Sequence, residues 1–107
     1  MEQSIVVYVS VGSERESLTI ARTLVEERLA ACVNLFPQVR SIYRWEGKIC
    51  DEPECYLIIK TRQRLFQTLK ERIKALHSYD VPEIIALPVV DGLDSYLEWI
   101  HRETEYS

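Results

Sequence analysis

The sequence lacks the short signatures of nucleotide, redox and nucleophile chemistry. Its three cysteines include no Cys-x-x-Cys pair, and its three glycines form no Walker or Rossmann loop. No serine or cysteine motif stands beside either of the two histidines. The odd cysteine count favours reduced thiols over a disulfide framework. We therefore expect a protein that is not an enzyme, with an undetected catalytic activity as the weaker alternative.

Long apolar runs and dense basic runs are also missing. No apolar stretch reaches the roughly 20 residues that a membrane span needs. The start, residues 1–4, has no basic region typical of a signal peptide, so we expect a cytoplasmic location and no membrane contact. The net charge is −4, which argues against binding nucleic acid through its phosphates. The third predicted strand, residues 55–61, carries one aromatic residue among aliphatic ones, unlike an RNA-recognition sheet.

What the chain does contain is a regular alternation of strands and helices. Its 107 residues, 47% hydrophobic, predict one domain over residues 1–107. The predicted strands are residues 5–11, 30–36 resuming at 39–45, 48–61 and 83–90, and the predicted helices are residues 13–29, 62–77 and a short one capped by Asp94. This order predicts the α+β class, with a ferredoxin-like βαββαβ sandwich and an extra C-terminal helix.

Local signals support this order. Ser13 and Glu16 fit a capping box at the start of the first helix. The apolar residues that define the buried face of this helix are predicted to be Leu18, Ala21, Leu24, Val25 and Leu29. Right-handed crossovers place the first and third strands in the centre of the sheet. Pro37 and Pro88 then fall on edge strands, where a missing N–H group is tolerated.

The second and third strands form a long hairpin, because Glu46-Gly47 supplies a tight turn between them. The outer half of this hairpin is polar and aromatic, and Tyr43 and Trp45 share one of its faces. These two aromatic residues indicate either an interface with another subunit or, less simply, a ligand cage. We predict that another subunit covers them.

The densest group of functional side chains is in residues 76–85, where a helix ends and the last strand begins. His77 lies at the negative end of the helix, a position that favours a cation. Pro82 keeps the preceding residue extended. A functional interpretation places His77, Tyr79 and Glu83 at the mouth of a cleft. A structural interpretation gives them the roles of a helix cap, a packed tyrosine and a strand start.

Metal binding is the remaining chemical option from the residues alone. Cysteine and histidine suit ions such as Cu and Zn, although Cys32, in an apolar strand, also fits a small buried hydrophobe. Cys50 and Cys55 should point to opposite faces of their strand. The acidic residues Asp51, Glu52 and Glu54 indicate either a site for a hard cation or a solvated charge run. The residues by themselves predict no closed metal site.

Five segments, in the same order, resemble the CutA divalent-cation tolerance proteins, over essentially the whole chain. The segments are Leu-Ala-Ala-Cys-Val-Asn at 29–34, Ser-Ile-Tyr-Arg-Trp-Glu-Gly-Lys-Ile at 41–49, Ile-Lys-Thr-Arg at 59–62, Leu-His-Ser-Tyr-Asp-Val-Pro-Glu-Ile at 76–84 and Asp-Ser-Tyr-Leu-Glu-Trp at 94–99. The turn of that family usually reads His-Pro-Tyr-Glu. Here Ser78 replaces the proline, which we expect to loosen the turn, and Asp80 replaces the glutamate with its charge retained.

The resemblance implies a cytoplasmic homotrimer of ferredoxin-like subunits, similar in architecture to the PII signalling proteins. It implies a part in tolerance of copper and other divalent cations, with no organic cofactor, no enzymatic activity firmly implied and no nucleic acid or membrane partner. Carried over by position, the implied metal ligands are His77 and Cys32. The implied inter-subunit cleft gathers Trp45, Glu46, Lys60, Tyr79 and Glu83. The alternative is a PII-like signalling or scaffold trimer, whose clefts bind a small anion through Lys60 and Arg62, or a partner protein.

Overall fold

The computed structural model describes residues 2–105, so the ends of the predicted domain, Met1, Tyr106 and Ser107, lie outside it. The strands are β1 (Ser4–Val11), β2 (Cys32–Trp45), β3 (Lys48–Arg62) and β4 (Ile84–Pro88). The helices are α1 (Glu14–Glu26), α2 (Phe66–Leu76) and α3 (Asp94–Glu103), with a short 3-10 helix, η1 (Gln63–Leu65), before α2. None of the helices in this part of the chain is long and apolar enough to cross a membrane.

The four strands form one antiparallel sheet in the order β2-β3-β1-β4. The prediction of a ferredoxin-like α+β fold is confirmed, including the two central strands. Pro37 lies where the register of β2 shifts between Phe36 and Val39, and Pro88 is the last residue of β4. Both prolines are on edge strands, Pro37 at an irregularity and Pro88 at a strand end. Their missing N–H groups therefore remove no hydrogen bond between the inner strands of the sheet.

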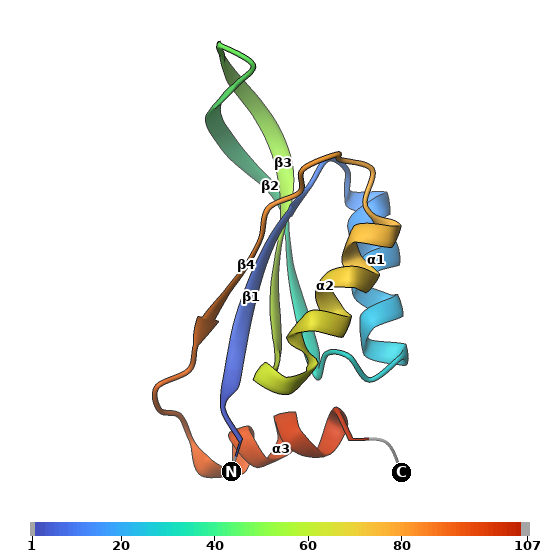
Figure 1. Ribbon diagram of the computed structural model, residues 1–107, viewed down its shortest axis with the longest axis vertical. Helices are drawn as coiled ribbons and strands as arrows, with labels where there is room; N and C mark the ends of the chain where they lie inside the picture. Colours follow the sequence, from blue (N-terminus) through green and yellow to red (C-terminus); the bar gives the residue numbers. More distant parts are fainter. Residues whose placement is uncertain (1, 106–107) are drawn as a thin grey trace.

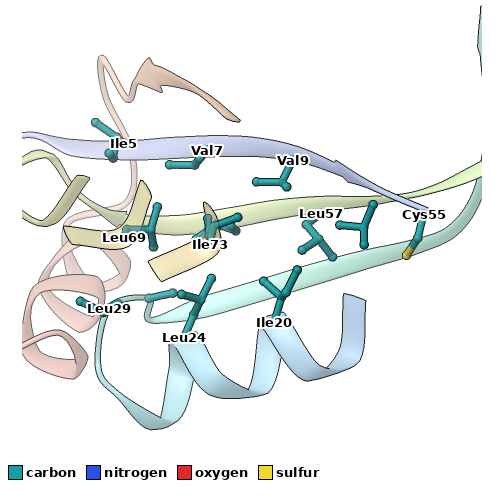
Figure 2. Close-up of a cluster of buried hydrophobic side chains, with 13 residues drawn as sticks. Ile5, Val7, Val9, Ile20, Leu24, Leu29, Cys55, Leu57, Leu69 and Ile73 are labelled. Carbon is teal, nitrogen blue, oxygen red and sulfur yellow. The ribbon is translucent and has the colours of Figure 1, made fainter. Parts of the chain in front are cut away.

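Helices α1 and α2 pack side by side on one face of the sheet (Figure 1). Alternate residues of β1 and β3 point toward them and form the core with side chains of both helices (Figure 2). The labelled core residues are Ile5, Val7, Val9, Ile20, Leu24, Leu29, Cys55, Leu57, Leu69 and Ile73. The predicted face of α1 was wrong at two positions, since Leu18 is 53% and Val25 43% exposed. Ile20 and Ser17 face the sheet in their place.

On the opposite face of the sheet, no helix of the described residues covers the middle of β1 and β3, and Tyr8 and Tyr56 pack against each other there. Two apolar residues of β4, Ile85 and Leu87, are exposed, unlike the apolar core residues of β1 and β3. Their register explains the difference, because Ile85 pairs with Tyr8 and Leu87 with Val6 on this open face. The first residue of the predicted strand, Glu83, precedes β4.

The hairpin of β2 and β3 extends well beyond the rest of the sheet (Figure 1). β1 ends at Val11, opposite Cys55, so residues 39–54 pair only with each other. At the tip, Glu46 and Gly47 both have positive φ, 50° and 79°, as a type I′ turn requires. The predicted turn is confirmed. Along this projection Ile42 is 67% and Ile49 63% exposed, so it offers apolar surface that its own core does not cover.

Helix α3 lies across the end of the sheet opposite the hairpin tip (Figure 1). The prediction that Asp94 caps it was wrong: Leu93 is at the N-cap, without a side-chain hydrogen bond, and Asp94 is the first helical residue. The C-terminal end of α3, rather than its N-terminal end, is held by a side chain, because Arg62 Nη2 donates to the carbonyl oxygen of Thr104 at 2.8 Å. Arg62 was expected to begin the second helix, but it ends β3 and uses its side chain to dock α3.

Candidate functional site: a cleft between the α2–β4 loop and the hairpin

The loop between α2 and β4 crosses the end of β1 and is fixed by His77. His77 Nε2 lies 2.7 Å from the carbonyl oxygen of Ser10, and Nδ1 accepts the Tyr79 N–H at 3.0 Å. A carbonyl oxygen can only accept, so the ring proton is on Nε2 and the imidazole is neutral. Both ring nitrogens of His77 are thus bound to backbone groups, which fixes the orientation of the ring at the end of α2.

Glu16 reaches this loop from the first turn of α1. The Ser13 hydroxyl accepts the Glu16 N–H at 3.2 Å, which confirms half of the predicted capping box. The Glu16 carboxylate does not return to Ser13; its Oε2 accepts the N–H and the hydroxyl of Ser78 at 3.3 and 3.2 Å. Proline at position 78 could not donate either bond. The turn expected to be loosened by Ser78 is thus held by two hydrogen bonds.

Two tyrosine–carboxylate pairs join this loop to β3. The Tyr79 hydroxyl donates to Glu54 Oε2 at 2.7 Å, and the Tyr56 hydroxyl donates to Glu83 Oε2 at 2.6 Å. Burial raises the pKa of both phenols, and the hydrogen bond that each donates to a carboxylate raises the pKa further. Both tyrosines are therefore neutral donors at physiological pH, and they fix the positions of the two carboxylates.

Between this loop and the base of the hairpin lies a cleft of about 610 Å³. Within residues 2–105, its lining combines three carboxylates with three aromatic side chains and contains no lysine or arginine. The lining residues are Ser10, Ser41, Ile42, Tyr43, Trp45, Glu54, Tyr79, Asp80, Val81 and Glu83. Lys74 is not among the lining residues, and its ammonium group binds the backbone carbonyl of Asp80. The cleft is thus acidic and aromatic, a combination that favours cations.

Of the five residues assigned to an inter-subunit cleft by resemblance, Trp45, Tyr79 and Glu83 line this cleft in a single chain. Glu46 lies at the hairpin tip, in the turn. Lys60 lies farther down β3, where its ammonium group binds the Asn34 side chain. The single chain therefore brings together three of the five.

The two metal ligands implied by resemblance lie apart in one chain. Cys32 pairs with Lys60, whereas the Ser10 that binds His77 pairs with Tyr56. These two positions of β3 are four residues apart, or about 13 Å along the strand. Cys32 and His77 therefore cannot share one ion within a subunit. Across residues 2–105, no three His, Cys, Asp or Glu side chains converge as a metal site.

The acidic residues of the hairpin also separate. Asp51 forms two hydrogen bonds of 2.7 Å with Arg40, which lowers the pKa of its carboxyl group. Glu52 is exposed, while Glu54 is 8% exposed and faces the cleft. No local pattern in the sequence separates Glu54 from its acidic neighbours. Only the register of β3, which buries Cys55 on the core face, places Glu54 on the cleft side.

Comparison with known proteins identifies the family. The model of the CutA1 divalent ion tolerance protein family matches residues 5–103. The chain belongs to this family. A Thermus thermophilus divalent-cation tolerance protein CutA is 52% identical over 92% of this chain and 96% of its own length. The chloroplastic CutA of Arabidopsis thaliana is also 52% identical, over 94% of this chain, but this chain covers only 56% of that longer protein.

Solved CutA structures share the whole fold. The structure from Thermus thermophilus superposes with a TM-score of 0.93 at 51% identity, covering 95% of this chain and 99% of that one. CutA1 from Oryza sativa gives 0.94 at 48% identity, covering 99% and 97%. These are CutA proteins from a bacterium and a plant, so the projecting hairpin and the extra C-terminal helix described above are part of a shared CutA fold.

Proposed function

We propose that this chain forms a cytoplasmic homotrimer that contributes to divalent-cation tolerance by binding copper or another divalent cation. The observation that carries the proposal is the match to the Thermus thermophilus protein named for divalent-cation tolerance, over nearly the full length of both chains. The negative charge of the cleft agrees with cation binding, because its lining within residues 2–105 offers three carboxylates and no lysine or arginine.

Assembly is supported by the apolar surface that one chain leaves open. Ile42, Ile49 and Ile85 are each half or more exposed, on the hairpin and on edge strand β4. β2 and β4 also end the sheet on both sides, so each has an outer edge that could pair with another strand. Tyr43 and Trp45, the residues predicted at a trimer interface, remain 39% and 46% exposed in one chain. A closed ring of subunits would cover this surface and both edges.

His77 with Glu16 is the donor pair that we propose for the cation. Glu16 Oε2 is 3.7 Å from His77 Nδ1, and both atom types are common ligands of borderline divalent ions. The fit is incomplete within one chain, because Nδ1 already accepts the Tyr79 N–H and no third donor from the described part of the chain converges on the pair. Binding at this pair therefore requires the Tyr79 N–H to move away. Cys32, with its thiol beside Asn34, is proposed only as a separate site.

An anionic ligand in the cleft has less support. The alternative of a PII-like trimer that binds a small anion depended on Lys60 and Arg62. Lys60 binds Asn34, and Arg62 is buried with its guanidinium directed to Glu2 and Thr104. Neither side chain lines the cleft.

The test is a calorimetric titration of the assembled protein with copper, with particle mass checked by light scattering. The chain has two histidines, so His77→Ala can be compared with His101→Ala as a matched control. We expect a trimer mass in all three proteins, stoichiometric binding in the wild type and the control, and binding lost in His77→Ala. Unchanged affinity in His77→Ala would contradict the donor assignment, and Cys32→Ser then tests the second location. A monomer mass would contradict the proposed assembly.

A further inference from the structure

The connection between α1 and β2 contains an arginine in a strained backbone conformation. Arg28 has a φ of 59°, in the left-handed region, and follows Glu27, the C-cap residue of α1. The N–H of Arg28 binds the carbonyl oxygen of Val25 at 3.1 Å, and the N–H of Leu29 binds that of Leu24 at 2.9 Å, which is the Schellman pattern of a helix end. Glycine is the usual residue at the position of Arg28, because a Cβ atom is disfavoured there. The arginine is therefore unfavourable for this helix end alone, and its side chain indicates a role elsewhere.

The side chain of Arg28 reaches the C-terminal end of α3, which lies beside the α1–β2 connection (Figure 1). Its Nη1 donates to the carbonyl oxygen of Glu103 at 3.2 Å and is 3.9 Å from Glu103 Oε1. Arg62 Nη2, from the end of β3, donates to the next carbonyl oxygen, that of Thr104, at 2.8 Å. Two guanidinium groups thus bind consecutive carbonyl groups at the negative end of the helix, where cations are favoured. We call Arg28 and Arg62 the arginine clasp.

The rest of α3 has few other attachments. Of its ten residues, Ile100 alone is buried, and the N-cap residue Leu93 makes no side-chain hydrogen bond. Thr104 is also buried, but its hydroxyl donates to the Ile100 carbonyl within the same segment. Within residues 2–105, Arg62 Nε and His101 Nε2 are buried without a hydrogen-bond partner, which favours states in which water reaches them. The attachment of α3 is therefore concentrated at its C-terminal end.

We infer that α3 is a strap that opens as a unit while the sheet, α1 and α2 remain folded, and that the arginine clasp sets how often it opens. Arg28 accepts the left-handed conformation because only from there does its guanidinium close the strap. Few buried apolar contacts and polar attachments at one end are typical of an element that opens below the free energy of global unfolding. The strap lies across the end of the sheet opposite the hairpin tip, so it is separate from the hairpin and from the His77–Glu16 pair.

Native-state amide exchange of the assembled protein, followed by nuclear magnetic resonance, tests the inference. In the wild type, we expect the amides of α3 to have protection factors at least tenfold lower than those of β1, whose apolar side chains form the core. Arg28→Gln removes the guanidinium and keeps an L side chain at the strained position. It should lower the protection of α3 about threefold and leave that of β1 unchanged. Arg22→Gln, an exposed arginine of α1, is the matched control and should change neither.

Arg28→Gly separates the clasp from the backbone strain. Glycine also removes the guanidinium, so α3 should lose protection as in Arg28→Gln, but the relief of strain should give Arg28→Gly the higher urea midpoint of the two. Arg62→Gln should lower the protection of α3 about tenfold or more, because its bond to Thr104 is buried. If Arg62→Gln fails to fold, the Arg28 variants decide alone.

Three results would overturn the inference. The first is equal protection of α3 and β1 in the wild type, which means that α3 opens only with the whole protein. The second is unchanged protection of α3 in Arg28→Gln, which means that Arg28 does not close the strap. The third is a loss of protection spread equally over α3 and β1 in this variant, because Arg28 would then stabilise the whole fold and not the strap.

Discussion

Replacing Ile49 by threonine tests whether the hairpin is an assembly surface. Ile49 is 63% exposed near the tip, so its side chain contributes little to the core of its own chain. Threonine keeps the β-branched shape, so the hairpin itself should form as before. The change therefore acts mainly on whatever covers the outer surface of the hairpin.

The magnitude follows from the exposed fraction. Complete burial of an isoleucine side chain contributes about 1.5–3 kcal/mol, so covering the remaining surface of Ile49 contributes about 1–2 kcal/mol per subunit. Three subunits give about 3–6 kcal/mol per trimer, or roughly 10²–10⁴ in the association constant. Sedimentation over a concentration series should show dissociation of Ile49→Thr at concentrations where the wild type remains assembled. Its melting temperature should also depend more strongly on concentration.

Val25→Thr is the matched control. Val25 is 43% exposed on α1, outside the hairpin, and the change is nearly isosteric. We expect this variant to associate like the wild type. If Ile49→Thr and Val25→Thr associate equally well, the hairpin surface faces solvent and the proposed assembly through it is wrong.

Two further substitutions test interactions within one chain. Tyr79→Phe should lower the free energy of unfolding by about 1–3 kcal/mol at pH 8, because it leaves the Glu54 carboxylate without its donor. The pKa of Tyr79 is raised in the folded state, so its contribution to the free energy of unfolding is present below the ordinary tyrosine pKa and is lost at higher pH. Urea titrations at pH 8 and pH 11 should therefore show that the difference in the free energy of unfolding between wild type and Tyr79→Phe decreases. Thr61→Val should cost about 1–3 kcal/mol in urea unfolding, since the buried Thr61 hydroxyl donates to the Leu29 carbonyl at 2.8 Å; an unchanged midpoint would place water on that carbonyl.

Most of the fold could be predicted from sequence because its signals are local. The order of the elements, the Glu46-Gly47 turn and the two edge-strand prolines all came from composition and spacing. The errors came from tertiary context. The face of α1 was assigned from periodicity alone, which could not distinguish Leu18 from its buried neighbour Ile20. Asp94 has the chemistry of an N-cap, but the chain enters α3 through Leu93.

The site was less predictable because its contacts join distant residues. Tyr79 and Glu54 are 25 positions apart, and Tyr56 and Glu83 are 27 apart. No local pattern indicates that these side chains meet. Their pairing depends on how far β3 extends past β1 and on the path of the loop before β4. The sequence therefore named Tyr79 and Glu83 as cleft candidates, but named Glu54 only as part of an acidic run with Asp51 and Glu52.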